Sequence, residues 1–293
     1  MKSLIKIHFA LSLLFATLTI PADAAMVLQS VGGNAASASI TATRDAFRND
    51  LGGGTTAGAN GSFGGVRREI NWDGVAATAS APNTLPANFF NVNSPRGVIF
   101  STPGTGFEVS GATTDAGAGQ PALADFGNIN ANYTNTFGVF SAQRLFTALG
   151  SNILDINFFV PGTTTPASVS GFGAVFTDVD TLGSTTLQFF DPNNVSLGTV
   201  DVPAGTVGSE SLSFLGAFFN AGERIGRVRV TSGNAALGAA VNDGGATDLV
   251  VVDDFIYSEP NAIPEPSSLS LALLGIISIA RSTRGYTSKP SRT

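Results

Sequence analysis

Short apolar runs separated by Gly, Pro and Asn recur along the middle of the chain. Such runs, rich in β-branched and aromatic residues and bounded by turn residues, are typical of strands. Their spacing of about 8–12 residues or slightly more, without helical periodicity, is typical of an all-β sandwich or barrel. The pattern predicts an all-β fold, a β-sandwich that we expect to be jelly-roll-like. The clearest runs are residues 97–101, 137–140, 153–160, 172–179, 185–190, 195–202, 211–219, 225–231 and 248–257.

Turn residues and side-chain alternation refine this picture. Residues 191–194 (Asp-Pro-Asn-Asn) and 220–223 (Asn-Ala-Gly-Glu) predict two hairpin turns. Residues 227–230 alternate Arg and Val, which places two arginines on one face of a strand and two valines on the other. Residues 31–65 are rich in Gly, Ala, Ser and Asn, and we expect them to pack as loops around the edge of the sandwich. Their apolar anchors are Phe47, Leu51 and Phe63.

The first 24 residues have the pattern of a secretory signal peptide. Lys2 and Lys6 precede the apolar run 9–20, and residues 22–24 (Ala-Asp-Ala) supply the small-x-small pattern that signal peptidase requires. We therefore expect an exported protein whose residues 25–260 form a single β-sandwich domain.

The C-terminal segment combines an extended motif with a short apolar run. Pro264, Glu265 and Pro266 stand before the apolar residues 269–280, and arginines follow at 281 and 284. The two prolines favour an extended backbone, the form in which proteases take their substrates. The apolar run is shorter than the ~20 residues that span ~30 Å of hydrocarbon, and the arginines favour the cytoplasmic side. We expect a sorting signal over residues 261–285, with a short hydrophobic helix at 269–280, and a basic tail over 286–293.

This order of elements resembles the PEP-CTERM sorting signal of Gram-negative bacteria. The resemblance implies that the chain is held briefly in the inner membrane and is cleaved near Pro-Glu-Pro by an exosortase. The product would then reach the cell surface or the medium, with signal peptidase and exosortase as partners during export. Scattered arginines and the extra residues 285–293 depart from the usual pattern. Similar tails are also labelled as an ice-binding protein C-terminal domain, but the Thr runs here lack the regular repeat of an ice-binding face.

The body of the chain resembles a group of exported PEP-CTERM proteins of unassigned function. That resemblance supports the fold and the export route only, because the group has no established activity. It rests on residues 68–74, 158–163, 171–180, 186–191, 212–232 and 251–260.

Charge excludes several partners. Only 12% of the residues are charged, against about a quarter in an average globular chain. Residues 25–263 contain no lysine, and their nine Arg stand against fourteen Asp and five Glu, a net charge of −10. A domain this acidic repels phosphate backbones, so nucleic acid is excluded as a partner. Anionic lipid is equally unsuitable, and we expect membrane contact only through the C-terminal tail.

The chain has no cysteine, and its one histidine, His8, lies in the predicted signal peptide. The mature protein would therefore lack thiol nucleophiles, imidazole bases, Ser-His-Asp triads and most zinc sites. This composition favours a non-enzymatic role.

Two adjacent carboxylates, Asp253 and Asp254, fall in the last predicted strand. Because both faces of that strand are apolar, we expect it to be central, where unneutralised carboxylates are costly. One candidate for neutralising them is Ca²⁺, which prefers six to eight oxygen ligands; the pair resembles the arrangement in calcium-binding jelly rolls of carbohydrate-binding type. Further ligands would come from Glu69, Asn71 and Asp73, or from Asp178 and Asp180. The alternative is a pair at the end of the strand, solvated or bridged to Arg227, Arg229 or Arg67.

Three hypotheses for function remain at this point. The first is a structural or interaction protein of the cell envelope or extracellular matrix. The second is a carbohydrate-binding module for extracellular polysaccharide, which requires Trp72 and tyrosines on an exposed face, although Trp72 also suits the core. The third is a glycosidase or lyase with two facing carboxylates, for which no spacing in the sequence singles out a pair.

Overall fold

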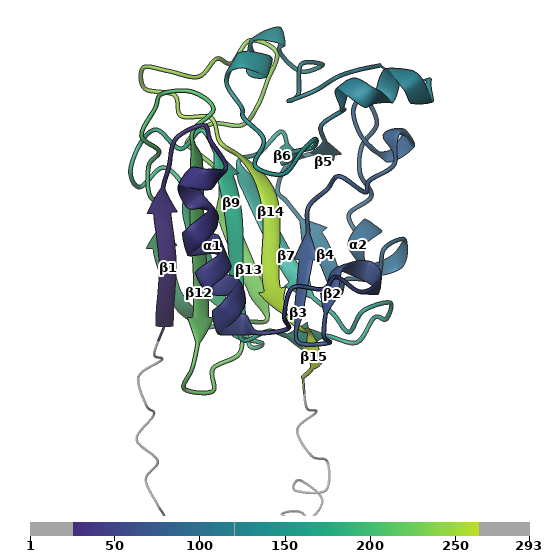
Figure 1. Cartoon of the computed structure of the whole chain (residues 1–293), viewed down its shortest axis with the longest axis vertical. Helices are drawn as coiled ribbons and strands as arrows, with labels where there is room; N and C mark the ends of the chain where they lie inside the picture. The colour runs from purple at the N-terminus through teal and green to yellow at the C-terminus, as the bar shows by residue number, and fades with distance from the viewer. Residues whose placement is uncertain (1–25, 120, 264–293) are drawn as a thin grey trace, which may run out of the picture.

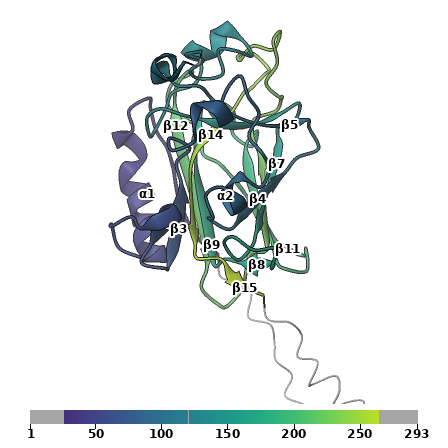
Figure 2. The ribbon, with the colours of Figure 1, turned by 90° about the vertical axis from the view of Figure 1, so that its right-hand side faces the viewer.

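The computed structural model describes residues 26–119 and 121–263; the predicted signal peptide and sorting signal lie outside the described residues. The described part consists mostly of strands in antiparallel sheets with few helices, which confirms the all-β prediction. Figures 1 and 2 show two sheets packed face to face, with the helix α1 (Ala38–Leu51) on the outer face of one of them.

The first sheet contains the last long strand, β14, at its centre. Its order is β1-β12-β9-β14-β3-β2, and β6 joins it by pairing with both β14 and β5. The sequence-based expectation that Asp253 and Asp254 lie in a central strand is confirmed. The strands are β1 (Met26–Gly32), β2 (Ser62–Phe63), β3 (Arg67–Ile70), β5 (Gly106–Val109), β6 (Phe146–Leu149), β9 (Gly171–Thr177), β12 (Leu212–Phe219) and β14 (Val251–Ser258).

The second sheet has the order β11-β10-β13-β7-β4. In β13 the residues alternate between half-buried arginines and buried valines, as the sequence predicts. A separate two-stranded sheet pairs β8 (Ala167–Ser168) with β15 (Asn261–Ala262). The strands of the second sheet are β4 (Val98–Ser101), β7 (Ile153–Phe158), β10 (Thr186–Phe190), β11 (Ser196–Asp201) and β13 (Arg227–Thr231).

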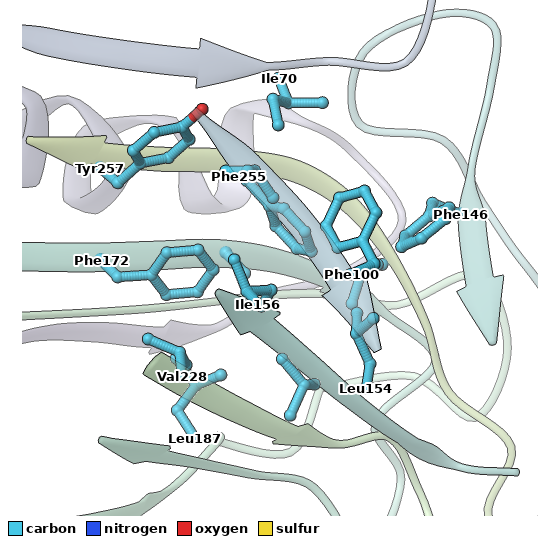
Figure 3. Close-up of a cluster of buried hydrophobic side chains, with 14 of the residues drawn as sticks. Ile70, Phe100, Phe146, Leu154, Ile156, Phe172, Leu187, Val228, Phe255 and Tyr257 are labelled. Carbon is cyan, nitrogen blue, oxygen red and sulfur yellow. The ribbon is translucent and has the colours of Figure 1, made fainter. Parts of the chain in front are cut away.

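The main core fills the space between the two sheets. Figure 3 shows Phe172 and Phe255 of the first sheet facing Ile156 and Val228 of the second. The cluster is rich in phenylalanine, and each buried Phe removes a large apolar area from water. Short helical segments surround this core: α2 (Phe89–Val92) and the 3₁₀ turns Ala59–Gly61, Ala77–Ala79, Thr113–Ala118 and Ala131–Asn135.

The prediction of loop-rich packing over residues 31–65 missed a helix, because α1 occupies the middle of this segment. Ile40 and Phe47 recur on one face and are fully buried against β9, β12 and β14, with Leu51 packed beside them. The helix sits close because the strands carry glycine beneath it: a Cβ at Gly173 or Gly216 would lie 2.8 or 2.7 Å from the Phe47 ring. The anchoring roles expected of Phe47 and Leu51 are confirmed.

Two further local predictions need correction. Residues 137–140 form no strand; instead the Phe140 amide donates a hydrogen bond to the Asp253 side chain in β14. Residues 220–223 do not close a hairpin: β12 and β13, on either side of them, belong to different sheets. The hairpin at residues 191–194 is confirmed, since β10 and β11 pair and Asp191 accepts from the Asn193 and Val195 amides at 2.8 Å.

The described domain begins and ends at the same pole. In Figure 1, β1 starts and β15 lies at the lower end of the sandwich. Because β1, β12, β9 and β14 pair antiparallel in that order, β9 ends and β14 begins at the opposite, upper end. The loops beyond these strands therefore point away from both ends of the described domain.

Candidate functional site

A bulge in β14 places Asp253 and Asp254 on the same face of the first sheet. The pairing with β9 shifts register between Val252 and Phe255, so that the two aspartates oppose a single residue, Val175. Val252 and Phe255 both point into the core between the sheets. The bulge leaves both carboxyl groups on the outer face, beside α1, where regular alternation would have sent one of them into the core.

The pair is buried and receives its hydrogen bonds from one loop. Asp253 is fully buried and Asp254 is 3% exposed. Asp253 accepts from the amides of Phe140 and Ser141 at 2.7 and 3.2 Å. The Ser141 hydroxyl lies 3.0 Å from Asp253 and 2.9 Å from Asp254. The predicted bridges to Arg227, Arg229 or Arg67 are absent among the described residues, since these arginines pair with Asp155 or Glu69.

The electrostatics favour a proton on this pair. Burial, followed by the negative charge of Asp254, raises the pKa of Asp253 well above its ordinary value. Burial also raises the pKa of Asp254, against the effect of hydrogen bonds from Asp253 and Ser141. A hydroxyl has only one proton to donate. The two Ser141 contacts are therefore both satisfied when one carboxyl group is protonated and donates in turn.

The other predicted calcium ligands lie nearby but have protein partners. Asp73 accepts from the Gln143 and Arg144 amides at 2.6 and 3.2 Å, so it binds the same loop as the pair. Burial raises the pKa of Asp73. Glu69 on β3 accepts from Arg48 of α1 at 2.5 and 2.9 Å, and from Arg67 at 2.8 Å. The structure thus brings this segment to Asp253 and Asp254, but protein donors serve its two carboxylates.

Trp72 belongs to the core, and the interpretation of it as a sugar platform is wrong. Its side chain is 1% exposed and stacks on Phe146 with ring centroids 4.1 Å apart. Its indole N–H donates to the backbone carbonyl of Asp253, which ties the bulge to the core. Tyr133 and Tyr257 are also fully buried. None of these three aromatic side chains is available for stacking on a sugar.

A cleft lies directly outside the pair, between α1, β3 and the loop of residues 57–63. It has a volume of about 450 Å³, and Asp254 and Ser141 form part of its lining. Arg44, Arg48 and Arg96 line it as well. An adjoining cleft of about 550 Å³ shares Arg44 and Arg48 and adds Arg67. The sequence predicts neither the cleft nor the cluster of arginines around it, because these arginines are spread along the chain from α1 to the loop before β4.

Aromatic rings hold three of these guanidinium groups in place. Arg44 lies 4.7 Å from the Phe140 ring centroid, Arg67 lies 4.4 Å from that of Phe63, and Arg96 lies 5.2 Å from that of Phe90. Burial, and next the positive charge of Arg48, lower the pKa of Arg44, against the effect of Asp45 and Asp254. Four of the nine arginines of residues 25–263 gather here, in a domain that is acidic as a whole.

A second group of carboxylates lies at the upper end of the sandwich. Asp178, Asp180 and Asp243 each offer an oxygen within 4.8 Å of the others. Among the described residues, no other group of three or more carboxylates converges as closely. Burial, together with the charges of Asp243, Asp180 and Asp248, raises the pKa of Asp178 to about 9. The sequence suggested Asp178 and Asp180 as ligands but gave no sign of Asp243, which lies 63 positions after Asp180.

Comparisons of the chain with protein-family models, with curated proteins and with solved structures found no match. Within residues 26–119 and 121–263, no helix has the length and apolar character needed to cross a membrane.

Proposed function

We propose that this chain is an exported, non-enzymatic protein of the bacterial envelope or extracellular matrix that binds an anionic polymer in the arginine-lined cleft. The observation that carries the proposal is the clustering of Arg44, Arg48, Arg67 and Arg96 around one cleft of an acidic domain. Export rests on the signal-peptide pattern and on the resemblance of the C-terminal segment to PEP-CTERM signals, with exosortase and signal peptidase as processing partners.

The chemistry of the cleft favours a ligand with carboxylate or sulfate groups, such as an acidic polysaccharide. Arginine presents planar, paired donors that suit such oxyanions. Physiological salt screens charges beyond about 8 Å, so a bound anion responds to the nearby guanidinium groups more than to the distant aspartates. With Trp72 and both described tyrosines buried, stacking on neutral sugars has no comparable support.

The strand connections also support the jelly-roll-like topology as part of this proposal. The chain passes from one sheet to the other between β3 and β4, β4 and β5, β6 and β7, β7 and β9, and β9 and β10, and at each step from β11 to β14. Such alternation between sheets is typical of Greek-key sandwiches. In this arrangement both ends of the domain lie at one pole, so a chain held by its C-terminal tail would present its upper loops outward.

Binding of a polyuronate to the purified full chain tests the function. We expect binding at low salt that weakens as salt is added, and little binding of an uncharged dextran. Arg44→Gln should lower the affinity by about 3- to 10-fold, since one exposed or partly desolvated cation contributes about 0.5–1.4 kcal/mol. Arg227→Gln is the matched control: Arg227 also stacks on a ring, that of Phe190 at 3.6 Å, but it lies on the other sheet.

Equal losses in Arg44→Gln and Arg227→Gln, or equal binding of dextran and polyuronate, would refute the cleft as the binding site. Export is tested separately by mass spectrometry of the protein recovered from its host. We expect an N-terminus near Ala25 and the loss of roughly 25 C-terminal residues, about the length of the segment that follows the Pro-Glu-Pro motif. A mature product that still ends in Thr293 would refute processing of the tail.

A second candidate is hydrolysis or elimination by the two carboxylates that line the cleft. Glu69 is fixed by Arg48 and Arg67, while burial raises the pKa of Asp254, as suits a general acid. This function predicts release of reducing ends or unsaturated products from a polyuronate, abolished by Asp254→Asn. Binding without turnover would leave the non-enzymatic proposal in place.

A further inference from the structure

The carboxylate group at the upper end of the sandwich joins two loops that are far apart in sequence. Asp178 directly follows β9, and Asp180 lies two residues further along the loop that leads to β10. Asp243 belongs to the long connection between β13 and β14. Because β9 and β14 are neighbours in the first sheet, their ends bring the three side chains together, with one oxygen of each within 4.8 Å of the others.

Asp178 differs from the other buried carboxylates in having no protein partner. Its side chain is 0% exposed, and neither carboxylate oxygen has a donor in hydrogen-bonding geometry among the described residues. The nearby Glu210 amide lowers the pKa of Asp178 slightly, but it donates its hydrogen bond to the Thr136 carbonyl at 2.7 Å. In the same part of the chain, none of the ion pairs formed by arginine involves Asp178, Asp180 or Asp243. An ionised carboxylate that is buried without donors is strongly destabilising unless a cation accompanies it.

The neighbouring Asp248 is not one of the three converging carboxylates, but it fixes the loop that carries Asp180. It accepts from the amides of Asp180 and Thr181 at 3.3 and 3.0 Å, and from the Ser184 hydroxyl. Asp243 in turn accepts from the Leu249 amide at 2.8 Å, which leaves its other oxygen free of that contact. These hydrogen bonds hold the backbone of the two loops in place, so that Asp180 and Asp243 are positioned before any ligand binds.

We propose that Asp178, Asp180 and Asp243 bind one Ca²⁺ ion at the upper end of the sandwich. Three carboxylates supply three to six oxygens, and Ca²⁺ takes six to eight, the remainder from backbone carbonyls or water. The group contains only oxygen ligands, which suits a hard cation and not zinc or copper. Mg²⁺ demands a stricter octahedral arrangement than three carboxylates on two loops supply. The site differs from the one expected from the sequence at Glu69–Asp73 and Asp253–Asp254.

Thermal unfolding of the purified full chain, with chelator and with calcium up to about 10 mM, tests this proposal at the affinities usual for extracellular calcium modules. We expect the melting temperature to rise by several degrees with calcium and less with magnesium, because an ion bound only to the folded state stabilises it. Asp178→Asn and Asp243→Asn should each abolish most of this rise. The partly exposed Asp243 provides a variant that folds even where Asp178→Asn does not.

Two controls distinguish the site from general effects of charge. Asp201→Asn, on the exposed edge of β11, should keep the full calcium response. Asp253→Asn should keep it as well. Coincident melting curves of the wild-type chain in calcium and chelator would overturn the proposal, and would indicate that Asp178 is a protonated acid. A response that survives in Asp243→Asn, or disappears in Asp253→Asn, would equally overturn the assignment to these residues.

Discussion

Two groups of buried carboxylates lie near the upper ends of the paired strands β9 and β14, and they differ in what surrounds them. Asp253 and Asp254 receive two backbone amides and a hydroxyl from one loop. Asp178, in the loop that directly follows β9, has no donor in hydrogen-bonding geometry among the described residues and lies beside two further aspartates.

This difference suggests two roles for buried carboxylates: a structural role for the pair in β14, and the proposed ligand-binding role for the group at Asp178. The pair in β14 is compensated within the protein, and its geometry is explained once the bulge and the Ser141 loop are seen. At Asp178 the oxygens of three carboxylates already converge, but the Asp178 carboxylate lacks hydrogen-bond donors among the described residues. An acidic pair that is conspicuous in a sequence is therefore not necessarily the metal site, because completeness of hydrogen bonding is a property of the fold.

The largest expected effect concerns the support of the β14 bulge. Trp72→Ala should reduce the free energy of unfolding by about 3–5 kcal/mol, the range for removing a large aromatic side chain from a core. The loss combines the stacking on Phe146 with the indole hydrogen bond to the Asp253 carbonyl. Urea denaturation measures it. A variant of unchanged stability would contradict the core position of Trp72.

Removing the donor that both carboxyl groups share should have the next largest effect. We expect Ser141→Ala to cost about 1–3 kcal/mol, because it leaves Asp253 and Asp254 without their common hydroxyl in a buried site. Ser209→Ala is the control, since that exposed hydroxyl contacts only the neighbouring Gly208 carbonyl. Similar losses in the two variants would show that the Ser141 hydroxyl does not support the pair.

The sandwich was predictable because its strands follow local rules. Alternation in β13, the Asp191 turn and the apolar runs of β9 and β12 are visible residue by residue. The helix α1 was not predictable in the same way. Its sequence has few large apolar residues. The helix packs closely on the sheet because Phe47 lies over two strand glycines, Gly173 and Gly216, which come more than 120 residues later in the chain.

The candidate sites were predictable only in part, for a related reason. The sequence correctly placed Asp253 and Asp254 in a central strand and brought the segment around Asp73 near them. It did not reveal the bulge, which changes the face on which one carboxyl group lies. Nor did it reveal the arginine-lined cleft or the position of Asp243, because both depend on which loops the sheet brings together.

The pH dependence of stability sharpens the comparison further. The folded-state pKa of Asp253 is raised above its unfolded value, so its contribution to stability is fully present below the unfolded pKa of about 3.9 and is lost as pH rises through the folded value. Wild-type stability should therefore fall by up to about 1.4 kcal/mol per pH unit in that window. Asp253→Asn should flatten this slope, since an amide accepts from both backbone amides and donates to Ser141 without titrating.

Urea denaturation across about pH 5–9, at saturating calcium so that the Asp178 group is held in one state, measures this slope. Asp201→Asn serves as the control, because its carboxyl group is exposed and belongs to neither cluster. Identical slopes for the wild type and Asp253→Asn would contradict the raised pKa of Asp253.

The smallest effect is expected where two arginines, one of them exposed, neutralise a carboxylate. Asp155 on β7 pairs with Arg227 at 2.7 Å and with Arg229 at 2.8 Å, two of the three arginines that the sequence suggests as partners of the β14 pair. The Arg229 side chain is 41% exposed, so water can replace much of the hydrogen bonding and charge stabilisation that Arg229 receives from the Asp155 carboxylate. Because Asp155 itself is 8% exposed, Asp155→Asn should cost about 1 kcal/mol, the upper end of the usual contribution of exposed ion pairs.

Salt distinguishes this ion pair from the buried pair in β14. At about 1 M salt the screening length falls to roughly 3 Å, and the difference between the wild type and Asp155→Asn should shrink towards zero. The cost of Ser141→Ala should persist, because it arises from an unsatisfied buried carboxyl group and not from attraction across solvent. Urea denaturation of both variants at low and high salt measures the contrast. A loss in Asp155→Asn that exceeds about 2 kcal/mol, or that salt leaves unchanged, would show that Asp155 is held as tightly as the carboxyl groups in β14.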